Sequence, residues 1–157
     1  MIPRLIALAT AVPPYALGQP EVTLRARHLF AERAGADLDR LMPVFANAGI
    51  ERRYSSVPID WYERNHGWAE RNALYLENAT TLLEQAARDA LALAGLAPAD
   101  IDTVVVVSTT GIATPSLDAR LMDRLGLRRD VRRLPIFGLG CAGGVLGLAR
   151  AADLARA

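Results

Sequence analysis

Residues 103–108 read Thr-Val-Val-Val-Val-Ser, a run of β-branched side chains ended by a serine. β-Branched residues favour extended backbone, and this run shows no alternation of polar and apolar positions. A strand of that kind is buried on both faces, as in a parallel sheet that helices cover on each side. The stretch therefore predicts an α/β fold.

The segments that follow and precede this strand continue the same alternation. Residues 69–94 and 117–125 carry apolar residues at helical spacing, and each segment is followed by a glycine. Residues 132–137 predict a second strand, and residues 142–157 have a helical pattern. Strands that alternate with helices of this length predict a largely parallel sheet.

The first part of the chain predicts one strand and two helices. Residues 2–9 read as a strand, and Gln19-Pro20-Glu21 opens a helix, with proline early and an acidic residue in the first turn. A second short helix is expected over residues 38–48, and residues 50–57 look extended. The expected order is β, α, α, then the helix over residues 69–94, and then β-α-β-α.

Composition and charge exclude several classes of protein. The 157 residues are 52% hydrophobic, which argues against disorder, and the net charge of +1 provides no field that would attract nucleic acid or an anionic membrane. A single cysteine cannot form an internal disulfide, and the apolar run over residues 5–9 is shorter than that of a signal peptide. We therefore expect a cytoplasmic protein that binds neither nucleic acid nor membrane.

The glycine-rich stretch Gly138–Gly144, GLGCAGG, matches the pattern G-x-G-x-x-G of dinucleotide-binding loops. That fingerprint normally occupies the first β-α turn of its domain and is followed, roughly 20 residues later, by an acidic residue. Here two predicted strands come earlier, and Asp153 comes too soon. The pattern therefore does not favour a nucleotide loop.

The same stretch holds Cys141, the only cysteine of the chain. A helix that begins at Ala142 would direct its free N–H groups at the sulfur and favour the reactive thiolate. Three glycines would leave room around the sulfur and let the turn pack closely, namely Gly140, Gly143 and Gly144. A lone cysteine is also often a small buried hydrophobe, so local sequence leaves both interpretations open.

Partners for a thiolate are scarce in this sequence. His28 is expected as a core or boundary residue and His66 as a turn residue, so neither is favoured as a base for Cys141. One cysteine and two distant histidines do not make a metal-ligand set. No G-x-S-x-G occurs, which argues against a serine hydrolase.

A longer stretch around the cysteine is recognisable. Residues 113–144, ATPSLDARLMDRLGLRRDVRRLPIFGLGCAGG, resemble the region of the catalytic cysteine in type III polyketide synthases, the chalcone synthase-like family, and its bacterial members above all. Three other stretches agree with the family in the same order: ALATAVPPY at 7–15, AGIERRY at 48–54 and VVVVSTTGIATPS at 104–116. The resemblance covers almost the whole chain.

This resemblance implies a fold, a reaction and an assembly. The fold is thiolase-like, with αβαβα layers and a mostly parallel sheet, and residues 1–157 would form its N-terminal half, ending before the C-terminal half. Family members are homodimers. They load an acyl group from acyl-CoA on a cysteine and extend it with malonyl-CoA by decarboxylative condensation, which yields pyrone or resorcinol-type polyketides. Coenzyme A thioesters are substrates, and no metal or prosthetic group is implied.

The resemblance also assigns roles to individual residues. Cys141 matches the nucleophile, and Thr109 and Thr110 match residues that line the cavity beside it. Thr114 matches a loop position that reaches across the dimer into the partner's cavity. Arg40 matches one of three basic residues that meet the coenzyme A phosphates, whereas Pro43 and Asn47 replace the other two.

The family's catalytic histidine and asparagine lie in the second half of its fold. We therefore expect this chain alone to lack synthase activity, and its uncovered apolar faces to pack against a second copy or a complementary C-terminal half. Two alternatives remain open. One is a condensing enzyme like ketoacyl-ACP synthase III, and the other is a non-catalytic half-domain that serves assembly or dimerisation.

Overall fold

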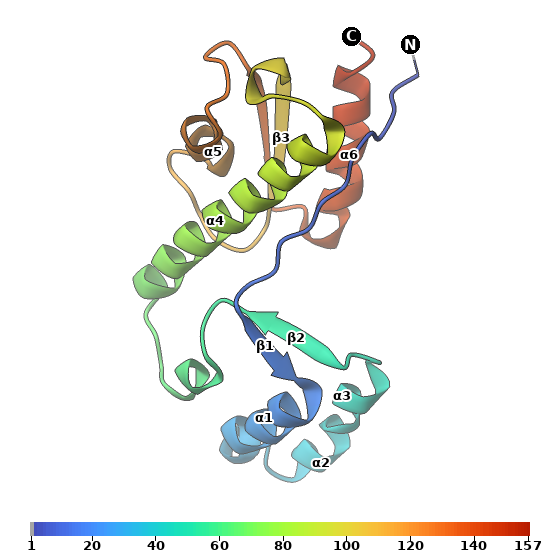
Figure 1. Cartoon of the computed structure of the whole chain (residues 1–157). Helices are drawn as coiled ribbons and strands as arrows, with labels where there is room; N and C mark the ends of the chain where they lie inside the picture. The colour runs from blue at the N-terminus through green and yellow to red at the C-terminus, as the bar shows by residue number, and fades with distance from the viewer. Residues whose placement is uncertain (1) are drawn as a thin grey trace. The chain divides into compact units, whose positions relative to one another are not determined.

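A computed structural model describes residues 2–157, apart from the side chains of residues 32–34 and 36. The chain divides into two compact units. One, here called the cysteine unit, combines Met1–Ala11 with Trp68–Ala157, and the other, the hairpin unit, is Val12–Gly67. Figure 1 traces the elements of both units along the chain.

The hairpin unit contains a short antiparallel strand pair. Strand β1 (Tyr15–Gly18) pairs with β2 (Arg52–Ser55), so that Tyr15 lies opposite Ser55. Between them the chain forms three helices, α1 (Gln19–Ala34), α2 (Leu38–Leu41) and α3 (Pro43–Asn47). The single helix expected over residues 38–48 is thus two helices, because a proline at residue 43 has no N–H with which to continue the hydrogen-bond pattern.

Gln19 is the polar centre of the hairpin unit, and it is buried. Its side-chain amide donates to the Phe45 carbonyl at 2.9 Å and accepts from Arg53 Nε at 3.0 Å. Its backbone N–H also donates to the Glu51 carbonyl at 2.9 Å. This one residue therefore joins the start of α1 to the middle of α3 and to β2.

The cysteine unit is built on a parallel strand pair. Strand β3 (Thr103–Ser108) pairs with β4 (Arg132–Phe137) in a register that runs from Thr103 opposite Arg132 to Ser108 opposite Phe137. The helices of this unit are α4 (Trp68–Ala94), α5 (Leu117–Leu125) and α6 (Gly143–Leu154). The predictions for β3, β4 and α5 are confirmed to the residue, and α4 and α6 lie within three residues of their expected ends.

The valines of β3 alternate between two helical layers. Val106 joins the buried cluster with Leu117 and Leu121 of α5, and Val104 packs against the same cluster beside α4. Val105 and Val107 point the other way, toward the glycines of α6. Figure 1 shows α5 and α6 on opposite sides of β3. Helices thus lie on both faces of this strand as predicted, but of its residues only Val106 is buried and the others are half-buried.

The strand predicted over residues 2–9 is wrong. This segment has no strand assignment, because a strand needs a hydrogen-bonded neighbour and none of the described strands pairs with it. It runs beside α4 and β3, where Leu5 and Ile6 line a hollow together with Leu83 and Val104. Its large side chains remain mostly in solvent, and Leu5 and Leu8 are each 75% exposed.

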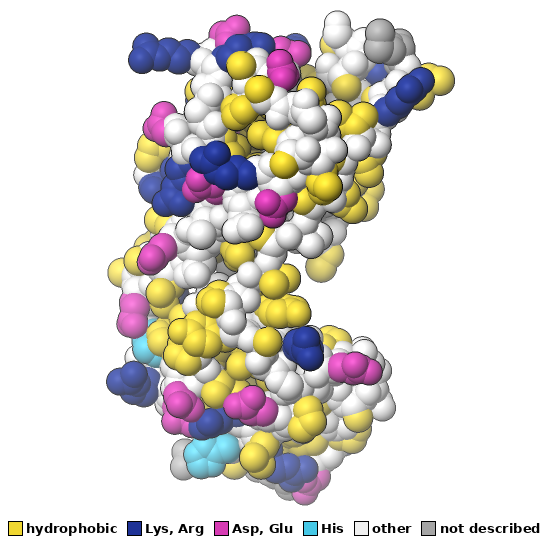
Figure 2. Space-filling view, viewed as in Figure 1, with side chains coloured by type: hydrophobic (Ala, Val, Ile, Leu, Met, Phe, Trp, Pro, Cys, Tyr) yellow, Lys and Arg dark blue, Asp and Glu magenta, His cyan; other side chains and the backbone are white. Residues whose placement is uncertain are grey.

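Apolar surface is extensive on the cysteine unit. On α6, Val145 is 73% and Leu148 67% exposed, and the side chains of the segment over residues 2–9 add to this surface. Figure 2 shows hydrophobic side chains where Figure 1 places α6 and this segment. Contiguous apolar surface of this kind is uncommon on a monomer and marks a contact surface.

An ion pair with one buried end ties α5 to β4. Asp118, in the first turn of α5, is 1% exposed, and its Oδ2 accepts from Arg133 Nη1 at 2.9 Å. Its Oδ1 is buried and has no hydrogen-bond partner among the described atoms. Arg133 is therefore the group that compensates the charge of this carboxylate.

Replacing that arginine should destabilise the chain. Arg133→Met leaves the Asp118 carboxylate buried without its cation, and we expect the free energy of unfolding to fall by about 2 kcal/mol. Arg132→Met is the matched control on the same strand, where the exposed arginine should change stability by less than about 0.5 kcal/mol. Urea denaturation followed by circular dichroism measures both. Equal losses of unfolding free energy in the two variants would show that the ion pair with Asp118 does not stabilise the chain.

Candidate active site

The carboxyl ends of β3 and β4 bring two loops together. Because the strands are parallel and end with Ser108 opposite Phe137, the segments that follow them leave from the same edge of the sheet. The Gly138 N–H donates to the Ser108 carbonyl at 3.3 Å and links the two loops directly. Thr109 and Thr110 therefore begin the loop after β3, and the glycine-rich stretch begins the loop after β4, at the same edge of the sheet.

Cys141 lies in a single 3₁₀ turn, Gly140–Ala142, immediately before α6. Its thiol is free and exposed, so the interpretation of Cys141 as a small buried hydrophobe is wrong for this chain. The helix begins at Gly143, one residue later than expected, and Ala142 is its N-cap. Gly138 and Gly140 have φ of 82° and 54°, a left-handed conformation that favours glycine and lets the chain turn sharply toward the helix.

Two glycines let α6 approach the sheet closely. A Cβ added at Gly143 or at Gly147 would lie 2.6 Å from a methyl carbon of Val107, whereas one added at Gly144 would meet nothing within 4 Å. The expectation of close packing is therefore confirmed for Gly143 and wrong for Gly140 and Gly144, where an added Cβ meets nothing within 4 Å. Gly147 was missed, although its spacing of four from Gly143 places both on one face of a helix and was visible in the sequence.

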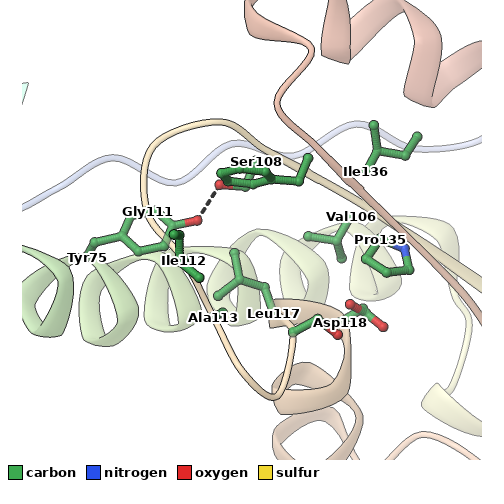
Figure 3. A pocket seen from close by; sticks show the side chains of 12 residues that line it. Tyr75, Val106, Ser108, Gly111, Ile112, Ala113, Leu117, Asp118, Pro135 and Ile136 are labelled. Carbon is green, nitrogen blue, oxygen red and sulfur yellow. Dashed lines mark hydrogen bonds between the residues drawn. The ribbon is translucent and has the colours of Figure 1, made fainter.

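The three threonines expected beside the cysteine all lie on the loop between β3 and α5. Thr109, Thr110 and Thr114 are exposed, so each can contact a ligand or another chain. The loop is held from α4: Tyr75 forms a hydrogen bond with Ser108, and Asn72 bonds to the backbone of Ile112. Figure 3 shows the bond between Tyr75 and Ser108 as a dashed line, with Gly111 and Ile112 alongside.

Behind this loop lies a pocket of about 210 Å³. Its lining is mostly apolar and comes from α4, α5, β3 and β4. The wall residues include Tyr75, Val106, Leu117 and Phe137. Asp118 also contributes to the wall; its Oδ2 is paired with Arg133, whereas its buried Oδ1 has no hydrogen-bond partner among the described atoms. The pocket lies on the face of the sheet that α4 and α5 cover, opposite the face that α6 covers.

The other candidates belong to the hairpin unit. Arg40 is exposed on α2 and pairs with Asp37 at 3.4 Å. His28 is exposed on α1, so the expectation of a core or boundary residue is wrong. His66 stacks on the indole ring of Trp61 at a centroid distance of 3.7 Å, and its Nε2 lies 2.8 Å from the Trp61 carbonyl. The cysteine unit itself contains no histidine.

Two kinds of site are not found in the part of the chain that the structure describes. Residues 2–157 contain no group of three or more side chains placed to hold a metal ion. Over the same range, no helix combines the length and the apolar character that crossing a bilayer requires.

Known proteins match this chain over nearly all of its length. The family model for the N-terminal domain of chalcone and stilbene synthases matches residues 4–157. A 1,3,6,8-tetrahydroxynaphthalene synthase of Streptomyces peucetius subsp. caesius is 44% identical over 94% of the chain and 39% of its own length. A putative chalcone synthase of Bacillus subtilis (strain 168) is 36% identical over 98% of the chain and 43% of its own length.

Solved structures agree with these matches. The 1,3,6,8-tetrahydroxynaphthalene synthase of Streptomyces coelicolor A3(2), described as a bacterial type III polyketide synthase, superposes with a TM-score of 0.84 at 28% identity, covering 93% of this chain and 41% of that one. The chain thus spans about two fifths of the length of the relatives it matches.

Proposed function

Since the chain belongs to the chalcone and stilbene synthase family and has the α/β architecture of type III polyketide synthases, we propose that it carries the acyl-loading site of such an enzyme, with Cys141 as the nucleophile. One observation carries the proposal. Cys141 is an exposed free thiol in a glycine-rich turn between a parallel strand and the start of a helix. That position combines access for a substrate with the positive end of a helix dipole.

The proposed first step is a transfer between thioesters. The Cys141 thiolate attacks the carbonyl carbon of an acyl-CoA, a new C–S bond forms at Sγ, and the original C–S bond breaks, so that coenzyme A leaves as a thiolate and takes up a proton. Malonyl-CoA then loses CO₂, and the carbanion that remains attacks the carbonyl carbon of the cysteine thioester. A C–C bond forms, the C–S bond to Sγ breaks, and the Cys141 thiolate leaves while the extended chain stays on coenzyme A. Repeated extension and ring closure would yield pyrone or resorcinol-type products. Both reactants are already activated, so the proposal includes no metal or prosthetic group.

Further residues have proposed roles in this reaction. Thr109 and Thr110 follow β3 at the sheet edge from which the cysteine turn also starts, which supports a role in lining the acyl cavity. Thr114 is proposed to contribute to the cavity of a second copy in a homodimer, and Arg40 to contact the phosphates of coenzyme A. The exposed apolar side chains of α6 support contact with a second copy or with a complementary C-terminal half. A cytoplasmic location remains our expectation.

The test is acylation of the thiol. The folded chain is incubated with a set of acyl-CoA thioesters, digested and mapped by mass spectrometry, with iodoacetamide in parallel to count accessible thiols. An acyl adduct on the peptide that contains Cys141 is expected. A thiol that reacts with iodoacetamide but with no acyl-CoA would instead support a non-catalytic half-domain. The family match favours the polyketide synthase over an enzyme like ketoacyl-ACP synthase III.

The isolated chain should accept an acyl group on Cys141 but should not extend it. Because the cysteine unit contains no histidine and the chain spans about two fifths of its relatives, we expect residues 1–157 alone to give no extended product from malonyl-CoA. Product analysis by liquid chromatography and mass spectrometry checks this. Polyketide formation by the isolated chain would show that Cys141 finds its acid–base partners within these residues.

A further inference from the structure

The loop between β3 and α5, residues 109–116, is held by side chains from both neighbouring helices. We propose that Asn72 of α4 and Arg120 of α5 are positioning residues that set the shape of the acyl cavity through this loop, and thereby the number of extensions that a polyketide chain undergoes. This rests on the proposed function, because the loop carries the three threonines assigned to the cavity.

Asn72 makes two hydrogen bonds with the backbone of one loop residue, Ile112. Its Nδ2 donates to the Ile112 carbonyl at 3.0 Å, and the Ile112 N–H donates to its Oδ1 at 2.9 Å. The side chain therefore satisfies both backbone groups of a loop residue that lies 40 positions away in the sequence. A paired donor and acceptor of this kind specify the orientation of the backbone as well as its distance.

Arg120 holds the far end of the same loop. Its Nε donates to the Pro115 carbonyl at 3.0 Å, and its Nη2 donates to the Thr114 carbonyl at 3.5 Å. Arginine presents its donors in a planar fork, so the two carbonyls are held in a defined relation to each other. The side chain of Thr114 thus projects from a backbone segment that α5 restrains.

Tyr75 limits the loop from behind. Its hydroxyl forms a hydrogen bond with Ser108, and a Cβ added at Gly111 would overlap its ring, so the loop backbone packs directly against this side chain. Figure 3 shows Tyr75, Gly111 and Ile112 close together among the residues that line the pocket. The backbone that carries the exposed threonines is therefore packed against Tyr75 on one side and hydrogen-bonded by Asn72 and Arg120.

The consequence for function is a change in product ratio rather than in turnover alone. Release of the loop would alter the space into which a growing chain extends, and small displacements at a reacting chain have large effects on rate. Loss of folded protein lowers every product equally, whereas a changed cavity changes the ratio of products that differ by one extension. The ratio therefore separates positioning from general stability.

The experiment compares Asn72→Ala with Asn78→Ala. Asn78 lies on the same helix, and its Nδ2 donates to the Leu74 carbonyl within α4, so it is a matched control that does not touch the loop. Asn72→Asp keeps the acceptor for the Ile112 N–H and loses the donor, and Arg120→Leu tests the other end. Each variant is studied as the chain itself and as this chain joined to the C-terminal portion that its relatives possess.

The first readout needs no activity. Hydrogen exchange of the Ile112 amide should become about tenfold faster in Asn72→Ala, while Asn72→Asp and Asn78→Ala retain protection. The second readout is the ratio of products that differ by one malonyl unit in the joined enzyme. It should shift by about threefold or more in Asn72→Ala and Arg120→Leu, less in Asn72→Asp, and not in Asn78→Ala.

The outcomes separate this inference from the proposed function. Unchanged Ile112 exchange in Asn72→Ala overturns the restraint by Asn72. Altered exchange with an unchanged product ratio, in an enzyme that makes polyketides, overturns the role in chain length and leaves the proposed function intact. A wild-type joined enzyme that makes no polyketide, although Cys141 and the loop are folded, overturns the proposed function and the role in chain length together.

Discussion

Replacing Cys141 with alanine is expected to abolish acyl loading and to lower polyketide formation by about 10³-fold or more in the enzyme joined to its C-terminal portion. Cys141 provides the only thiol of the chain, so no neighbouring sulfur can take over the acyl group. The effect on rate should be far larger than the effect on stability, because the side chain is exposed and its backbone lies in an ordinary 3₁₀ turn.

Mass mapping and product analysis measure this loss, and a thermal unfolding curve is the control. Cys141→Ala should retain the unfolding temperature of the wild type to within about 2 °C, because an exposed substitution that leaves the turn intact changes stability little. Cys141→Ser places a weaker nucleophile at the same position and should load acyl groups at a small fraction of the wild-type rate. Wild-type levels of product from the folded alanine variant would rule out a covalent role for Cys141.

Replacing Gly147 with valine is expected to destabilise the chain by about 3 kcal/mol, at the upper end of what overpacking usually costs. The new Cβ would lie 2.6 Å from a methyl carbon of Val107, and a β-branched valine is too short and stiff to move aside. The helix would have to lift from β3, and the cysteine turn, which joins β4 to α6, would move with it.

Gly144→Val is the matched control for this substitution. Gly144 lies on the same helix, but a Cβ there meets nothing within 4 Å, so the change should be neutral or stabilise by about 0.5 kcal/mol through helix propensity. Val107→Ala combined with Gly147→Val should recover part of the loss, because removing the methyl groups opens the space that the valine needs. Chemical denaturation of the four proteins measures these energies. A similar loss at both glycines would mean that the contact with Val107 is not the cause.

Much of the cysteine unit could be predicted from sequence because its signals are local. The valine run of β3 and the apolar spacing of α5 each act within a few residues, and both elements have the predicted ends. Glycines with positive φ end α4 and α5, at Gly95 and Gly126, where the sequence placed the ends of those helices. The position of Cys141 between a strand and a helix followed from the same kind of signal.

The failures occur where a partner far along the chain decides the outcome. Residues 2–9 have the composition of a strand, but a strand forms only where another backbone pairs with it, and the described residues offer none. Tyr15–Gly18 follows two prolines and was not predicted, yet it is a strand because Arg52–Ser55 pairs with it. Composition describes what a segment could form, whereas pairing decides what it does form.

The sequence by itself therefore determined the α/β class, the helices and strands of residues 68–157, the candidate nucleophile and the family that the chain resembles, because short-range patterns and motifs depend on neighbouring residues. The tertiary structure alone decided which valines meet α6, why Gly147 cannot be larger, and how Asn72 reaches Ile112 across 40 residues. These contacts depend on where whole elements pack against one another, and packing brings together side chains whose spacing along the chain carries no signal.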